Sequence, residues 1–279
     1  MRDNLWLRRL FLRHPIGAMG AALIGTLVAV ALLAPLLAPY RPAAQIAQRL
    51  QPPSPAHLLG TDEFGRDMLS RIIYGSRISI FVGLVAVGIA LTAGVAIGLL
   101  SGYFGGRMDH LAMRVMDIIF SFPALILAIA ITGILGPSLT NATIAIGIVY
   151  TPTFARLARG TVLSVLQHEY VTAARALGAS DARIMRVHVL PNIAAPITVQ
   201  TTLNLSTAIL AEAALSFLGL GTQPPDPSWG TMLGTGRRYM ESAPWVAVFP
   251  GLAIMMAVLG FNLLGDGLRD ILDPRLRAT

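Results

Sequence analysis

The side chains that could carry out chemistry are few in this 279-residue chain, and their types exclude several functions. All 21 basic residues are arginine, so the chain lacks the lysine that contacts nucleotide phosphates in a P-loop and any lysine for a Schiff base. The five histidines follow no His-Glu-x-x-His pattern, and cysteine is absent, so we expect neither a bound metal nor thiol chemistry. We therefore predict that the chain is not an enzyme and binds no cofactor itself.

Two carboxylates fall inside long apolar stretches, where an ionisable side chain is costly and often functional. Asp117 lies three residues after Arg114, so we expect these two side chains to pair along one helix at the membrane boundary. Glu212 has no such neighbour, and it could line a transport pathway, contact a partner subunit or lie at the membrane interface. Two carboxylates are few for a transporter driven by an ion gradient, and no histidine falls within an apolar stretch, where an intramembrane hydrolase would need one.

The elements that must position these residues are six apolar stretches, each able to cross a hydrocarbon core of roughly 30 Å. The composition agrees, because 54% of the residues are hydrophobic and only 13% are charged. The formal charge of +7 is attributed to membrane orientation and not to nucleic-acid binding. The sequence thus predicts an all-α, polytopic membrane protein with about six transmembrane helices, over residues 16–37, 78–102, 115–136, 139–155, 193–220 and 245–264.

The orientation of these helices follows from the arginines, because basic residues are retained on the cytoplasmic side. With both termini in the cytoplasm, twice as many arginines fall inside as outside. The arginine-rich start precedes an uncharged stretch, 16–37, that exceeds the roughly 7–15 apolar residues of a signal peptide. We therefore predict that this stretch is an anchoring helix and not a cleaved signal.

A polar segment with several arginines, residues 169–192, lies between two apolar stretches on the predicted cytoplasmic side. Its apolar spacing predicts a helix that ends at Gly178, because glycine tolerates the left-handed conformation that closes a helix. Ser180 or Asp181 can cap a second short helix, which Pro191 should end. Such a bent helix pair is suited to docking on a soluble partner, although an amphipathic linker on the membrane surface would share its first half.

This segment resembles the EAA loop of ABC importer permeases, which reads Glu-x-x-x-Ala-Ala-x-x-x-Gly followed by Ile-x-x-x-x-x-Leu-Pro. In that family the loop lies in the cytoplasm and inserts into a groove of the ATPase subunit. The resemblance implies an ATPase-coupling loop within the cytoplasmic segment 156–192. The matching residues are Glu169, Ala173, Ala174, Gly178, Ile184, Leu190 and Pro191.

A second polar segment, residues 39–74, is expected outside the cell and has a different pattern. Helical spacing of apolar residues from Phe64 to residue 73 predicts an amphipathic helix on the outer membrane face or on the protein. Arg66 could pair with Asp62 or Glu63, and Asp67 could pair with residue 71. Packing is the expected role of this segment.

The same segment closely resembles the Gly-Thr-Asp-x-x-Gly-Arg-Asp signature of the shorter, C-type permease in dipeptide, oligopeptide and nickel importers. The match spans Gly60 to Asp67. Further strings typical of that subfamily follow in order, so that the resemblance extends from near residue 5 to residue 277. These strings are 113–123 (MRVMDIIFSFP), 215–221 (LSFLGLG), 229–230 (WG) and 261–269 (FNLLGDGLR).

The resemblance implies the MetI-like ABC permease fold in the bacterial cytoplasmic membrane. Residues 1–76 would form a cytoplasmic tail, the first helix and the outer segment, and residues 77–279 a five-helix permease core. The implied partners are a second permease subunit, two ATP-binding subunits that use the ATP, and an extracytoplasmic substrate-binding protein. The implied cargo is di- or oligopeptides, or related solutes such as nickel chelates or glutathione, with selectivity expected to rest largely on the binding protein. The alternative is an ATP-independent secondary transporter or channel, which would predict an inverted repeat of spans that we do not find.

Overall fold

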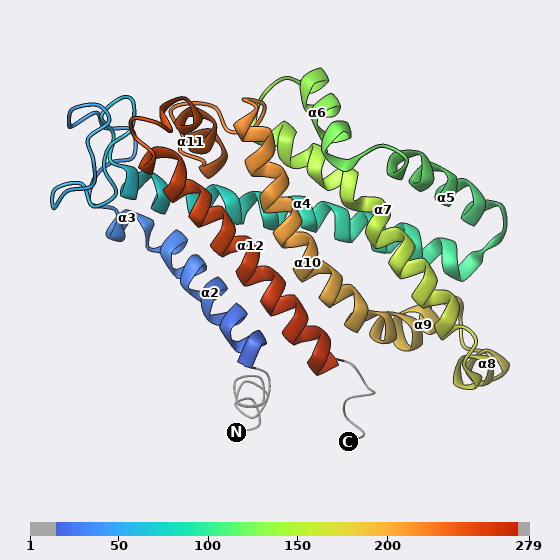
Figure 1. Cartoon of the computed structure of the whole chain (residues 1–279). Coiled ribbons are helices and arrows are strands. Elements are labelled where there is room, and N and C mark those ends of the chain that lie inside the picture. The colour runs from blue at the N-terminus through green and yellow to red at the C-terminus, as the bar shows by residue number, and fades with distance from the viewer. Residues whose placement is uncertain (1–14, 273–279) are drawn as a thin grey trace.

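The computed structural model describes residues 15–272, and within that range the chain is helical with only two isolated β-bridges. The all-α prediction is therefore confirmed. Figure 1 shows the helices, in chain order, as α2 (Pro15–Leu32), α3 (Ala34–Leu37), α4 (Met68–Phe104), α5 (Gly106–Phe120), α6 (Ala124–Leu135), α7 (Leu139–Val165), α8 (Glu169–Ala176), α9 (Asp181–Ile184), η1 (Met185–Val189), α10 (Leu190–Phe217), α11 (Trp229–Gly236), η2 (Arg237–Tyr239) and α12 (Trp245–Leu272).

Four helical stretches in the described range are long and apolar enough to cross a membrane. They are α2, α4, the continuous stretch Asp181–Phe217 and α12, and the bent pair of α5 and α6 could form a fifth. Helix α7 contains the predicted stretch 139–155 and has 27 residues, but Arg156 and Arg159 make it less apolar. The prediction of about six spans is compatible with this arrangement.

The predicted amphipathic helix of the outer segment is wrong, because its residues belong partly to a loop and partly to α4. Helix α4 begins at Met68 and continues without a break for 37 residues, about 55 Å at the usual rise per residue. Asp67 caps it, since its carboxylate accepts the backbone N–H of Ser70 at 2.8 Å. The domain boundary expected after residue 76 consequently falls inside a continuous helix.

The predicted third span, 115–136, is also different in the structure. Helices α5 and α6 meet at an angle of 90° around residues 121–123, so this part of the chain is bent and not straight. Pro123 explains the break, because proline has no N–H for a helical hydrogen bond and disfavours helical conformation in the residue before it.

Glycines allow the closest helix contacts. Gly94, Gly98 and Gly102 recur every four residues on the side of α4 that faces α7, and a Cβ at Gly98 would overlap the backbone of Ala155. At the other side of the bundle, α2 approaches α12 where Gly17 meets the backbone of Gly267. Small residues at such spacing let two membrane helices pack backbone to backbone.

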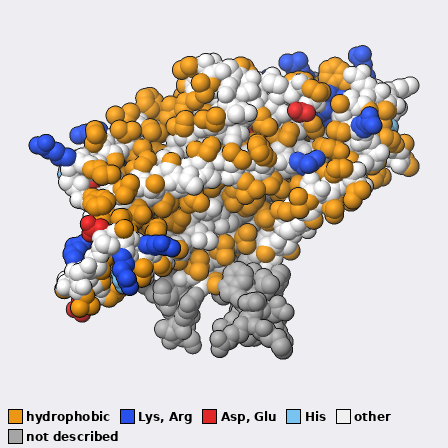
Figure 2. All heavy atoms as spheres, turned by 180° about the vertical axis from the view of Figure 1, so that it is seen from behind, with side chains coloured by type: hydrophobic (Ala, Val, Ile, Leu, Met, Phe, Trp, Pro, Cys, Tyr) orange, Lys and Arg blue, Asp and Glu red, His pale blue; other side chains and the backbone are white. Residues whose placement is uncertain are grey.

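The helices form a bundle with two distinct ends (Figure 1). Helices α8 and α9, the start of α2 and the last turn of α12 lie at one end. The opposite end holds α11 and the loop of residues 38–67, which is the part of the predicted outer segment that precedes α4 and is called the outer segment below. Figure 2 shows hydrophobic side chains over the middle of one face and arginines gathered towards the ends, as expected for a body that crosses a membrane.

Candidate functional site

Helix α8 projects from one end of the bundle and has one anchored side and one free side (Figure 1). Val171 is buried and joins the main hydrophobic cluster. On the free side, Tyr170, Ala173 and Leu177 are exposed, and Leu177 has 88% of its surface accessible. Their i, i+3 and i+7 spacing forms an exposed apolar stripe, in which only the Tyr170 ring has neighbours, the rings of His168 and His188 at 5.4 and 6.0 Å between centroids, among the contacts of the described residues.

The turn after α8 confirms the predicted helix end. Gly178 has a φ of 80°, its N–H donates to the Arg175 carbonyl at 3.0 Å, and the Ala179 N–H donates to the Ala174 carbonyl at 3.1 Å. These two bonds form a Schellman motif, which satisfies the last carbonyls of the helix. A Cβ at Gly178 would meet no atom within 4 Å, so the requirement for glycine comes from the backbone conformation alone.

The second half of the segment differs from the prediction. Ser180 caps α9 by accepting the Arg183 N–H, as expected, but Pro191 does not end the helix. It lies in the first turn of α10, and α9, η1 and α10 form one helical stretch. The π-helical turn of η1 directly precedes Pro191 and shifts the hydrogen-bond register, so the missing proline N–H does not break the chain.

The other residues of the predicted coupling loop vary in exposure. Glu169 is exposed in the first turn of α8, where a negative charge favours the helix dipole. Ala174 is half-buried, and Ile184, the last residue of α9, is fully buried. Leu190 and Pro191 are exposed at the start of α10. The structure thus brings these residues to one end of the bundle. Most of them are exposed there, whereas Ile184 packs in the main hydrophobic cluster.

A link between this loop and α4 was missed by the sequence analysis. The Tyr103 hydroxyl donates to the Asp181 carboxylate at 2.6 Å, and the Arg175 guanidinium lies 5.9 Å from the centre of the Tyr103 ring. A tyrosine near the end of a long apolar helix is a recognisable signal of a membrane interface, but nothing in the sequence named its partner.

Asp117 does not form the predicted pair with Arg114. Its carboxylate accepts from Arg156 of α7 at 2.8 Å instead, because α5 packs beside α7. A second pair joins the same two helices, since Arg159 donates two hydrogen bonds to Asp109 at 2.6 and 2.7 Å. The two contacts tie α5 to α7 on the side of α8.

Glu212 is completely buried inside the chain, with no accessible surface. One carboxyl oxygen accepts from the Ser216 hydroxyl at 2.7 Å and lies 3.5 Å from the Thr222 hydroxyl, whereas the other has no hydrogen-bond partner. In this conformation the side chain does not reach the surface of the chain. The side chain therefore joins α10 to the loop before α11, and its expected contact with the transport pathway or with a partner subunit stays a prediction.

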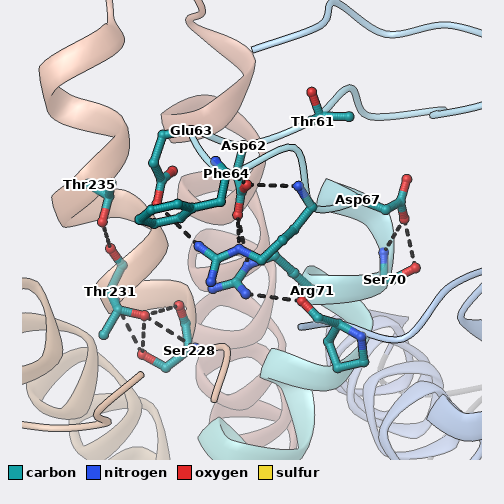
Figure 3. A network of polar contacts seen from close by, with 12 residues as sticks. Thr61, Asp62, Glu63, Phe64, Asp67, Ser70, Arg71, Ser228, Thr231 and Thr235 are labelled. Atoms are coloured by element: carbon teal, nitrogen blue, oxygen red, sulfur yellow. Dashed lines mark hydrogen bonds and ion pairs between the residues drawn. The ribbon is translucent and has the colours of Figure 1, made fainter. Parts of the chain in front are cut away.

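The outer segment carries a buried polar network, drawn in Figure 3. Arg66 pairs with Asp62 and with Glu63, which confirms that prediction. The predicted pair of Asp67 with Arg71 is wrong, because Asp67 caps α4 and Arg71 lies 3.4 Å from the Asp62 carboxylate. Burial, followed by the neighbouring Asp62 carboxylate, raises the pKa of Glu63 above its ordinary value. Within residues 15–272 no cluster of acidic residues and histidines could hold a metal ion.

Two family models match this chain. Residues 94–278 match the binding-protein-dependent transport system inner membrane component, and residues 5–53 match the N-terminal transmembrane domain of oligopeptide transport permease C. The chain is similar to a dipeptide transport system permease of Alkalihalophilus pseudofirmus, with 49% identity over 95% of this chain and 88% of the relative. It is also similar to a di/tripeptide transport system permease of Pseudomonas aeruginosa, with 52% identity over 95% of this chain and 90% of the relative.

The fold has a solved counterpart. The inward-facing MetNI methionine ABC transporter contains a chain that superposes with a TM-score of 0.60 at 19% identity, covering 74% of this chain and 98% of that chain. This likeness supports the predicted MetI-like permease fold. The family models and the two relatives show that the chain belongs to the binding-protein-dependent transport system inner membrane components, as a C-type permease subunit of an ABC transporter and not an ATPase.

Proposed function

We propose that this chain forms one half of a permease that imports short peptides, powered by ATP that separate subunits hydrolyse. The observation that carries the proposal is the exposed apolar stripe of Tyr170, Ala173 and Leu177 on α8, a helix that projects from one end of a membrane bundle. A stripe of this kind fits a groove on a soluble partner. Three similar permeases are named for dipeptides, for di- and tripeptides and for glutathione, which supports short peptides as the cargo.

The proposed partners are a second permease subunit, two ATP-binding subunits and an extracytoplasmic binding protein. ATP would bind only to the partner subunits. The excess of arginines supports a cytoplasmic location for both termini and for α8. The start of α2, the last turn of α12 and α8 lie at one end of the bundle, which agrees with that orientation (Figure 1).

The proposed mechanism is that closure of the ATPase pair moves α8 and α9 as a rigid unit and swings the adjoining helices. The connections support it, because α8 follows α7 and because α9 continues through η1 into α10 as one 37-residue helical stretch. The Schellman turn at Gly178 fixes the angle between α8 and α9. A displacement of α8 would therefore be transmitted to α10, because no long flexible loop separates the two helices.

The test is to co-express this chain with the products of neighbouring genes, purify the complex and reconstitute it in liposomes. We expect ATP hydrolysis and peptide uptake that both depend on a binding protein. Leu177→Asp should abolish both and prevent copurification of the ATPase, because a charge would replace the most exposed apolar side chain of the stripe. The matched control is Leu58→Asp, which changes an exposed leucine of the outer segment and should retain ATPase binding.

Two outcomes would contradict the proposal. Peptide uptake by this chain alone, indifferent to ATP, would identify a secondary transporter or channel. Full ATPase binding by the Leu177→Asp variant would remove α8 as the coupling surface.

A further inference from the structure

Helix α5 has few apolar contacts with the rest of the bundle. Of its 15 residues only Asp109 and Met116 are buried, and none belongs to the main hydrophobic cluster of the described chain. Helix α7, which packs beside it, is embedded in that cluster, since Ala158 and Val162 have no accessible surface. An element that buries so little apolar surface depends on its polar contacts for its position.

Two arginines of α7 hold α5 near both of its ends. Arg159 donates two hydrogen bonds to Asp109, in the first turn of α5, at 2.6 and 2.7 Å. Arg156 donates to Asp117 at 2.8 Å, and its guanidinium lies 4.2 Å from the centre of the Phe120 ring, in the last turn of α5. Two-pronged hydrogen bonds between charged groups are strong and directional. We call the two arginines and these three partners the arginine clamp.

Each of the two helices has a break next to the arginine clamp. Helix α7 contains Pro152, about one turn before Arg156, and a proline inside a helix removes a hydrogen bond and favours a kink. Helix α5 ends at Phe120, and α6 begins after Pro123 at an angle of 90°. Because Arg156 contacts the last turn of α5, the two breaks lie next to each other.

The parts of the chain on either side of these breaks have different neighbours. On one side, the start of α6 and the part of α7 before Pro152 line an apolar cavity of about 200 Å³ together with α10. Ala128 of α6 is buried in the main hydrophobic cluster, which holds this part in place. On the other side, α7 leads through residues 166–168 into α8. A displacement of α8 would therefore act first on the part of α7 that carries the two arginines.

We propose that the arginine clamp makes α5 and the part of α7 after Pro152 move as one unit during transport, bending at Pro152 and at residues 121–123. The inference rests on the proposed function, because the movement starts at α8 when the ATPase pair closes. With the clamp intact, both helices tilt together below the cavity. Without it, the displacement of α7 would separate α7 from α5 and leave the angle between α5 and α6 unchanged. Arg156 and Arg159 are thus positioning residues for the coupling of ATP hydrolysis to uptake.

The first test measures the number of peptides imported per ATP hydrolysed by the reconstituted complex. We expect Asp117→Arg to lower this ratio about fivefold, because it places two arginines against each other in an exposed pair that contributes little to stability. ATP hydrolysis stimulated by the binding protein and the thermal transition temperature should stay close to the wild-type values. Exchanging the charges, as Asp117→Arg with Arg156→Asp, should recover most of the ratio. Arg159→Gln weakens the second pair and should also lower the ratio.

The matched control is Arg114→Asp, which reverses an exposed charge on α5 that forms no ion pair with another described residue. It should leave the ratio unchanged. An unchanged ratio in Asp117→Arg, or a low ratio that the charge exchange does not recover, would overturn the inference and leave the proposed function intact. A wild-type complex without ATP-dependent uptake would instead overturn the proposed function.

A distance measurement tests the movement itself. The chain contains no cysteine, so Leu111→Cys on α5 and Leu163→Cys on α7, both exposed, can carry two spin labels in a complex with cysteine-free partners. We expect the distance between the labels to be the same with and without trapped ATP, and to change on ATP binding when Asp117→Arg is added. A change on ATP binding with the arginine clamp intact would show that α5 and α7 move separately, and would overturn the inference whatever the transport ratio.

Discussion

Gly178 occupies a position where the backbone, and not the surroundings, limits substitution. Its φ of 80° lies in the left-handed region, and space around its α-carbon is open. For a residue with a Cβ this conformation costs about 1–2 kcal/mol, and a β-branched side chain raises the cost further. Such a residue would relieve the strain by unwinding the Schellman turn, which would change the angle between α8 and α9.

We therefore predict that Gly178→Val abolishes peptide uptake while the protein still inserts into the membrane. Uptake by cells and the amount of protein in the membrane fraction check the two halves of this prediction. Gly160→Val is the matched control, because Gly160 is also free of neighbours within 4 Å but has no positive φ. Equal uptake by the two variants would show that the turn geometry is not needed for coupling.

The polar partners show what a single sequence can predict at this scale. The pair of Arg66 with Asp62 spans four residues and was predicted from helical spacing, and it forms although these residues lie in a loop before α4. Asp117 pairs with Arg156, which lies 39 residues away in the sequence, and not with the nearby Arg114. Such a choice depends on how α5 packs against α7, and no pattern within one helix encodes it.

The helix boundaries show the corresponding limit for elements. Apolar stretches correctly indicated where the chain crosses the bundle, but α4 extends about ten residues before its predicted start at residue 78. The sequence analysis expected Asp67 to pair with residue 71, and it assigned the apolar residues up to residue 73 to a separate amphipathic helix. Pro123 is a local signal for the break between α5 and α6. The prediction missed the break because it relied on the apolar content of residues 115–136 as a whole. The continuation of α10 through Pro191 required a π-helical turn, which has no recognisable sequence pattern here.

The contact between α4 and α7 leads to a prediction about packing. A Cβ at Gly98 would overlap the Ala155 backbone and lie 2.8 Å from the Ala158 side chain, so Gly98→Val must push the two helices apart. We expect a loss of about 3 kcal/mol, towards the upper end of the range for overpacking, measured as a lower thermal transition temperature in detergent. Gly88→Val, on the same helix with no atom within 4 Å, should leave that temperature nearly unchanged. A similar transition in both variants would show that α4 and α7 do not rely on this close approach.

For the molecule as a whole, α4 is the element that joins the two functional ends. Near its start, the Ile72 carbonyl accepts the indole N–H of Trp229 at 3.0 Å, which ties α4 to α11. Near its end, Tyr103 contacts Asp181 of the proposed coupling loop. A continuous helix of 37 residues transmits displacement better than a chain of loops, because its backbone hydrogen bonds resist bending. A movement of α8 and α9 can therefore reach the outer end by this route as well as through α10.

This arrangement predicts that the Tyr103 hydroxyl affects the efficiency of coupling more than assembly. Tyr103→Phe removes one hydrogen bond, worth about 1 kcal/mol, and keeps the buried ring. We expect up to about a fivefold decrease in peptides imported per ATP hydrolysed, with the complex assembled as in the wild type. Asp181→Ala should reproduce the effect, whereas Asp181→Asn keeps an acceptor oxygen and should restore most of the ratio.

The matched control is Tyr40→Phe, which removes a comparable hydroxyl contact in the outer segment, to the Ala56 carbonyl at 3.1 Å. It should leave the ratio of peptides imported per ATP unchanged. A normal ratio in Tyr103→Phe would show that α4 is only a scaffold and that α10 alone carries the movement.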